Sequence, residues 1–246
     1  MLSWYDGRTL QGVSVWLKPW KFQLSTGSYL LTLAWVMLWL EPHRRSTWAG
    51  KYVVWAAIAS AWFEVGYISW QAAWGRTSHF NVGTPYDATM YALMGVGAVL
   101  LTSTALVLGF QVLRNRSFGL SEGLRQAIGW GLVLTFVLGT GFGSYLSSQT
   151  GHWVAGAASD AHGMWFTTWS RSGGDLRVAH FFGIHAVHFL VAWIWLLERA
   201  WLWLAGRSLR GVSGVPPSLV WASAMVYSAF TLWTFWQALG GRAFLG

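Results

Sequence analysis

Apolar residues gather into six long runs, separated by segments that hold most of the charges. The runs cover residues 25–40, 51–74, 88–113, 127–147, 178–204 and 218–239. Each is close to the roughly 20 residues that a helix needs to cross a bilayer, although the first is slightly short. Lipid cannot hydrogen-bond an open backbone, and none of the runs contains a proline. The pattern therefore predicts six transmembrane helices with no forced kink.

The segment before the first run has a different character. Residues 10–24 mix apolar and aromatic side chains with Lys18 and Lys21, and Pro19 interrupts them. Such a segment is too short and too charged to cross a membrane, and it suits the membrane surface. The start of the chain lacks the pattern of a removable signal peptide. We expect residues 1–24 to form an external or interfacial segment and residues 25–246 to form one all-α, polytopic membrane domain.

Composition supports the membrane setting. Of the 246 residues, 54% are hydrophobic and 10% are charged, whereas soluble domains carry about 25% charged residues. The 21 tryptophans fit an interfacial belt, where an indole ring meets apolar chains and its N–H meets polar groups. The net charge of +8 comes from Lys and Arg in the connecting segments, so it indicates membrane topology, and no nucleic-acid partner is expected.

Several kinds of chemistry are excluded by residue type. The chain has no cysteine, which excludes disulfides, thiolate nucleophiles, and cysteine-bound zinc or iron–sulfur clusters. No lysine lies deep in an apolar run, which excludes a retinal Schiff base. The GTGFG stretch at 139–143 has no strand before it and lies inside an apolar run, so it predicts close helix packing rather than a nucleotide site.

The connecting segments predict an orientation. The loops after the first, third and fifth runs hold nine basic residues, and the opposite side holds seven in longer segments. Basic residues in short loops mark the cytoplasmic side. Both termini are therefore expected on the external side, together with the loops at 75–87 and 148–177. The second of these loops is long and contains histidines and tryptophans, which favours a folded cap. Asp175 is expected to cap the helix that follows it.

Two runs carry polar side chains at matching depths. In the second run, Glu64 is the only acidic residue well inside any run, and it shares one helical face with the residues spaced i−4, i+3 and i+7, namely Ser60, Tyr67 and Gln71. In the fifth run, His188 lies at the same depth as Glu64, roughly 16 Å below the external end. If the two helices are neighbours, Glu64 can pair with His188. The simplest interpretation is a hydrogen-bonded pair that joins two helices.

Other interpretations assign chemistry to the same residues. An ionisable group at membrane depth is a candidate functional residue. For a metal ion such as Fe, Cu or Zn, His185 and His188 are the first candidate ligands, with His180, Glu64 or His79 completing the shell. For haem, one histidine of the fifth run would pair with another axial ligand. The candidates for that second ligand are His79, His152 and His162.

The reaction and the partners stay open at this point. An enzyme at this site would carry out redox or metal-assisted chemistry on a lipophilic substrate. Glu64 would serve as a metal ligand or as a general acid or base, and Arg76 and Arg171 would orient a polar group of the substrate. The residues expected to hold a cofactor are His79, His180 and His185. A buried Glu–His pair also fits proton-coupled transport. A third class is an accessory subunit of a larger membrane complex that binds lipid, quinone or pigment.

Overall fold

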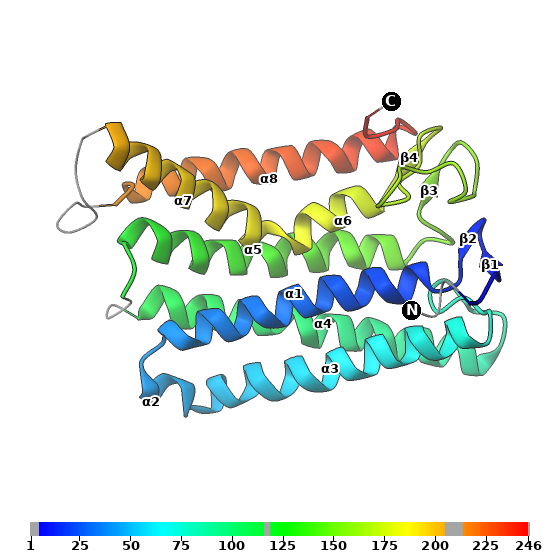
Figure 1. Ribbon diagram of the computed structural model, residues 1–246, viewed down its shortest axis with the longest axis horizontal. Helices are drawn as coiled ribbons and strands as arrows, with labels where there is room; N and C mark the ends of the chain where they lie inside the picture. Colours follow the sequence, from blue (N-terminus) through cyan, green and yellow to red (C-terminus); the bar gives the residue numbers. More distant parts are fainter. Residues whose placement is uncertain (1–4, 116–118, 205–213, 246) are drawn as a thin grey trace.

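The computed structural model describes residues 5–115, 119–204 and 214–245, and it is an elongated bundle of helices (Figure 1). Long helices run along its main axis and are joined by shorter elements at the two ends. In chain order the helices are α1 (Leu17–Trp39), α2 (Pro42–Arg45), α3 (Trp48–Ala73), α4 (Pro85–Arg114), α5 (Glu122–Ser147), α6 (Arg177–Ile184), α7 (Ala186–Leu204) and α8 (Pro217–Leu239). We call the end where both ends of the chain lie the cap end, and the other the opposite end.

Five helices are long and apolar enough to cross a membrane, which marks the chain as an integral membrane protein. They are α3, α4, α5, α7 and α8. Their outward faces carry large exposed apolar side chains such as Trp55, Trp62 and Trp236, as a lipid-facing surface requires. α1 has 23 residues and lies along the same axis, but it is not among these five. The prediction of six spans is thus confirmed for five helices and not for the first.

The N-terminal segment folds differently from the sequence prediction. A short hairpin of β1 (Thr9–Leu10) and β2 (Val13–Ser14) comes first, and α1 then begins at Leu17. One continuous helix therefore joins part of the expected interfacial segment to the first apolar run. Pro19 lies in the first turn of α1, where the missing backbone N–H would have no helical partner, so it does not interrupt the helix.

The fifth apolar run is broken, where one uninterrupted helix was expected. α6 ends at Ile184, His185 leaves helical geometry with φ −102° and ψ 11°, and α7 starts at Ala186. Side chains from neighbouring helices satisfy the backbone at the break. Tyr227 of α8 donates its hydroxyl to the carbonyl of Phe182 at 2.6 Å, and the N–H of Val187 donates to Thr135 Oγ1 of α5 at 3.1 Å. Such partners make broken helices tolerable at membrane depth.

Glycines bring the broken segment close to α5. A Cβ added to Gly131 would lie 2.8 Å from Val187 Cα, and one added to Gly139 would lie 2.9 Å from Ile184 Cγ2. A Cβ on Gly183 would lie 2.9 Å from the backbone nitrogen of Gly139. The expectation that the GTGFG stretch serves close helix packing is confirmed at Gly139.

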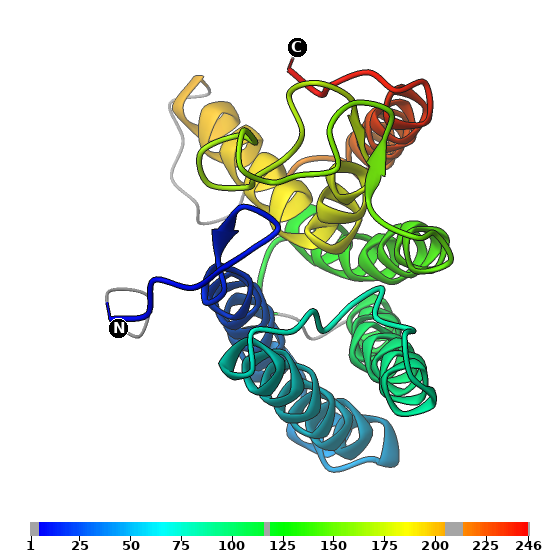
Figure 2. The ribbon, with the colours of Figure 1, turned by 90° about the vertical axis from the view of Figure 1, so that its right-hand side faces the viewer.

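α4 and α5 form the centre of the bundle, with α3 against α4, and α6, α7 and α8 against α5. α1 contacts α3 and lies between that helix and the α6–α7 segment (Figure 2). A buried apolar cluster fills the interior, with contributions from α1, α3, α4, α5 and α7, including Val36, Val53, Leu108, Leu132 and Val187. This arrangement places α1 between the two helices that carry the polar residues of interest.

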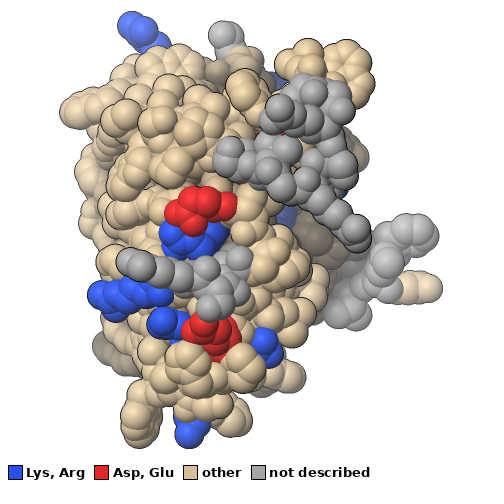
Figure 3. All heavy atoms as spheres, turned by 90° about the vertical axis from the view of Figure 1, so that its left-hand side faces the viewer, with Lys and Arg blue, Asp and Glu red and all other residues tan. Residues whose placement is uncertain are grey.

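The long loop at the cap end is folded, as the sequence predicts. Strand β3 (Trp153–Val154) pairs antiparallel with β4 (Gly174–Asp175), and the loop lies across the helix ends (Figure 2). The N-terminal hairpin is attached to it, because the N–H of Asp160 donates to the carbonyl of Gln11 at 3.0 Å. The opposite end carries separate lysine, arginine and acidic side chains on an otherwise uncharged surface (Figure 3).

Candidate functional site

The polar face of α3 is buried, in agreement with its helical spacing. Ser60, Glu64, Tyr67 and Gln71 are all at most 7% exposed, and the Gln71 amide donates to Tyr67 Oη at 2.6 Å. Glu64 is 5% exposed, and its Oε1 has no hydrogen-bond partner among the described residues. Gly97 of α4 makes room for this carboxylate, because a Cβ there would lie 2.9 Å from Oε1.

His188 contacts α1 rather than α3. Its Nε2 lies 2.9 Å from Thr32 Oγ1, and its Nδ1 lies 3.3 Å from Nδ1 of His185. Because α1 lies between the two polar faces, Glu64 and His188 do not form the ion pair that neighbouring helices would have allowed. The matching depths along the two runs therefore did not correspond to a contact.

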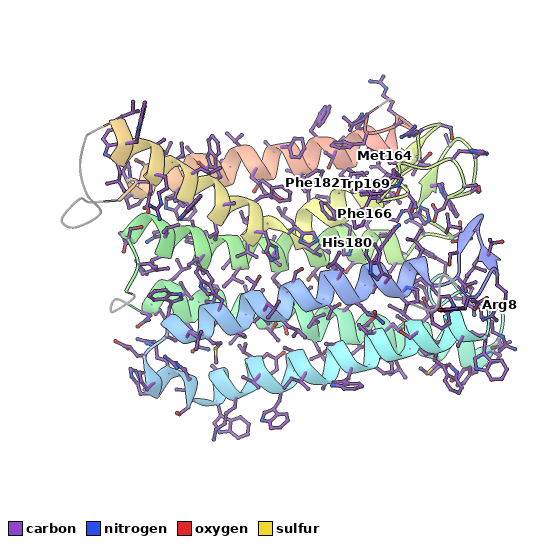
Figure 4. All side chains as sticks on the ribbon, in the orientation of Figure 1. Arg8, Met164, Phe166, Trp169, His180 and Phe182 are labelled. Atoms are coloured by element: carbon purple, nitrogen blue, oxygen red, sulfur yellow. The ribbon has the colours of Figure 1, made fainter. Side chains whose placement is uncertain are left out.

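His180 is oriented by the backbone of α5. Its Nδ1 lies 3.1 Å from the carbonyl oxygen of Gly139, and Figure 4 labels it on α6 beside the aromatic side chains of the cap. A carbonyl only accepts, so Nδ1 carries the proton and Nε2 keeps its lone pair. Gly143 accommodates the ring, since a Cβ there would lie 2.9 Å from His180 Cε1. This is the arrangement in which a histidine binds a metal centre through Nε2.

His79 lies in the segment between α3 and α4, within electrostatic range of His180. Its Nδ1 is 3.0 Å from Ser78 Oγ, and its ring centroid lies 5.4 Å from that of Phe22 and 5.9 Å from that of Tyr91. Burial lowers the pKa of His79 well below its usual value, and the nearby charge of Lys18 acts in the same direction. His79 is therefore a neutral imidazole at pH 7, the form that binds metals.

A network of charges holds the cap over these histidines. Arg177 Nη2 lies 2.9 Å from Asp160 Oδ1 and 2.7 Å from Asp175 Oδ2. Asp175 also accepts the backbone N–H of Arg177 at 3.0 Å, so it caps the first turn of α6 although the residue at the N-cap position is Leu176. His152 lies between the two acids, with Nδ1 3.5 Å from Asp175 Oδ1.

Aromatic side chains complete the cap. The Trp169 ring lies 5.4 Å from Phe181 and 5.6 Å from Phe244, edge to face in both cases. Figure 4 shows Trp169, Phe166 and Met164 together at the cap end of α6, next to Phe182 and His180. The cap is thus a packed aromatic layer above the histidines.

The remaining predicted site residues are not part of this arrangement. Arg76, Arg171 and His162 have exposed side chains. Within residues 5–115, 119–204 and 214–245, no three His, Asp or Glu side chains converge closely enough to hold a metal ion. The four predicted metal ligands lie at three separate places. Glu64 faces α4, and His180 is hydrogen-bonded to a backbone carbonyl of α5. His185 and His188 contact each other beside Thr32 of α1.

Sequence reasoning missed two contributors. Thr32 binds His188, but a single threonine in an apolar run gives no signal of its own. Lys18 was expected only as part of a segment at the membrane surface, and it lies within electrostatic range of Glu64, His79 and Arg177. The signal that could have identified it is the charge itself, placed directly before an apolar run.

No protein-family model, no curated protein and no solved structure matches this chain.

Proposed function

We propose that this integral membrane protein binds a haem-type tetrapyrrole at the cap end of the bundle and transfers electrons. His180 and His79 would hold its iron. The observation that carries the proposal is the contact between His180 Nδ1 and the carbonyl of Gly139, which leaves Nε2 free to bind iron. Haem needs only one or two protein ligands, so it does not require a converging set of three.

The surroundings of His79 support the same ligand. Ser78 Oγ is hydrogen-bonded to Nδ1 of His79 at 3.0 Å, so a neighbouring group also orients this imidazole. Phe22 and Tyr91 place flat apolar surfaces beside the ring, and the aromatic layer of the cap lies above His180. Two axial imidazoles would fill the coordination of iron, which suits electron transfer rather than oxygen binding. By the positive-inside rule we place the cap end on the external side of the membrane.

A spectrum tests this proposal directly. Purified protein in lipid nanodiscs is titrated with haemin, and a sharp Soret band with the low-spin signature of two histidine ligands is expected. His180→Ala and His79→Ala should each weaken binding at least tenfold and shift the spectrum toward high spin. His162→Ala serves as the matched control, because His162 is exposed. A wild-type protein that leaves the haemin spectrum unchanged, or a His180→Ala variant that binds equally well, would rule the proposal out.

A second candidate, proton-coupled transport, has one observation in its favour. His185, His188 and Thr32 form a hydrogen-bonded chain from the break between α6 and α7 to α1, with distances of 3.3 and 2.9 Å. Such a chain is a plausible path for protons at membrane depth. Proteoliposomes with an internal pH dye test it: His188→Ala should abolish proton flux, and equal flux in the variant would remove this candidate. Recovery of the chain with a second membrane subunit after mild extraction would instead favour an accessory role.

A further inference from the structure

Lys18 differs from the other cations near the candidate site. Lys21, one turn further along α1, donates to the carbonyl of Thr167 at 3.0 Å and to Thr168 Oγ1 at 2.9 Å. Arg177 is bound by two carboxylates, and Arg8 is paired with Asp6 at 2.7 Å. Lys18 is half-buried and has no hydrogen bond or ion pair with any residue that the structure describes. Burial without a partner disfavours the charged form of Lys18, and a bound anionic group would relieve this cost.

The position of Lys18 connects it to the two histidines. Its Nζ lies 6.0 Å from the centre of the Phe22 ring, and that ring is 5.4 Å from the ring of His79. His79 in turn is within electrostatic range of both Lys18 and His180. Lys18 is therefore at the side of the candidate site nearest the start of α1, where the chain enters the membrane region from the cap end.

Glu64 provides a second, independent observation. It lies within electrostatic range of Lys18, yet the two side chains do not form an ion pair, and Glu64 Oε1 has no hydrogen-bond partner among the described residues. Lys18 Nζ and Glu64 Oε1 thus both lack a hydrogen-bond partner among the described residues, and polar groups of a bound molecule could satisfy them. A molecule with both an acidic arm and an apolar body fits this arrangement.

We propose that Lys18 binds a carboxylate arm of the ligand, which for haem is a propionate. This inference rests on the proposed function. The ligand class is an amphiphile with a flat apolar body between His79 and His180 and an acidic edge toward the cap end. The physical reason is that an ammonium–carboxylate hydrogen bond in a partly desolvated site is stronger than one between neutral groups. The acidic edge then lies where the lysine stem can extend along apolar surface.

Haemin and its dimethyl ester separate this inference from the proposed function, because the ester keeps the iron and the ring but has no free carboxylate. Wild-type protein in nanodiscs should bind haemin about tenfold or more tightly than the ester. Lys18→Met should bind both equally, and Lys18→Arg should keep the preference. Lys51→Met is the matched control, because Lys51 is exposed and lies at the start of α3, at the opposite end.

Each outcome has a defined meaning. Equal binding of the two compounds by the wild type overturns the role of Lys18 while leaving the haem proposal intact, and this comparison needs no variant to fold. A full preference in a folded Lys18→Met protein also overturns it. Failure of both compounds to bind wild-type protein rejects the proposed function and this inference together. A preference that is lost in Lys18→Met and restored in Lys18→Arg supports it.

Discussion

Nε2 of His188 lies 2.9 Å from Oγ1 of Thr32, so the deepest histidine of the broken helix is bound to α1. This contact predicts a spectroscopic result. In protein labelled with ¹⁵N-histidine, Thr32→Val should shift the Nε2 resonance of His188, because the hydrogen bond is lost. Glu64→Gln should leave that resonance in place, since α1 lies between the two residues. A shift caused by Glu64→Gln alone would show that the two groups interact after all.

The close packing of α5 on the broken helix predicts a strong dependence on glycine. Gly139→Ala should lower the free energy of unfolding by about 1–3 kcal/mol, because its Cβ would meet Ile184 at 2.9 Å in a packed interior. Gly141→Ala, two residues along the same helix, should have almost no effect because nothing lies within 4 Å of its added Cβ. Unfolding by sodium dodecyl sulfate in mixed micelles measures both variants. Equal stability of the two would contradict the packing described.

The helix break predicts a cost for removing its side-chain partners. Thr135→Val leaves the N–H of Val187 without an acceptor, and Tyr227→Phe leaves the carbonyl of Phe182 without its hydroxyl donor. Each change should cost about 1 kcal/mol of unfolding free energy. Ser228→Ala is the control on α8, because that hydroxyl bonds only the carbonyl of Ala224 within its own helix. The same unfolding assay measures all three variants. A loss of unfolding free energy no larger than in the control would contradict a role of Thr135 and Tyr227 in stabilising the break.

The cap predicts sensitivity to loss of Arg177. Arg177→Gln leaves Asp175 (2% exposed) and Asp160 without their shared cation, which should cost about 3–5 kcal/mol. The loop at 148–176 should then become much more accessible to protease. Arg171→Gln, on the exposed side of the same loop, should behave as wild type. Limited proteolysis of both variants in nanodiscs tests this, and an equally resistant Arg177→Gln protein would refute it.

The buried position of His152 predicts that the cap becomes less stable as the pH falls. Burial lowers the pKa of His152 from its usual 6.5, and this effect outweighs the carboxylate of Asp175, which raises the pKa. The unfolded chain therefore binds more protons than the folded one between the two pKa values. The contribution of His152 to the free energy of unfolding is then fully present above about pH 6.5, and it is lost as the pH falls toward the lower pKa of the folded state.

Asp175 acts at more acidic pH. Burial alone would raise its pKa, but His152 and Arg177 together hold it well below its usual value of 3.8. Its contribution to stability is therefore lost only below that value. Hydrogen exchange of the cap between pH 7.5 and 5 measures the effect of His152 separately. His152→Asn should flatten the dependence in this range, whereas the exposed control His162→Asn should retain it. An unchanged slope in His152→Asn would remove His152 as the cause.

Hydrophobic patterning alone determined most of the architecture. The apolar runs correctly located the five helices that can cross a membrane, because lipid leaves a long apolar segment little alternative to a helix. Spacing along α3 also correctly placed Glu64 on a buried polar face, since a helix has a fixed period. The aromatic content of the long loop indicated a folded cap, which the pairing of β3 with β4 confirms.

Only the tertiary structure decided which polar groups meet. The matching depths along two runs suggested that Glu64 and His188 were partners. Which helices are neighbours, however, is decided by the packing of segments far apart in the sequence, and α1 lies between α3 and the α6–α7 segment. The break at His185 was equally invisible, because it depends on Tyr227 and Thr135 of other helices to satisfy the freed backbone. The orientation of two further histidine rings also depends on the tertiary structure. A backbone carbonyl of α5 orients the ring of His180, and Ser78 orients that of His79. The sequence determined which residues enter the membrane, and the packing determined their partners.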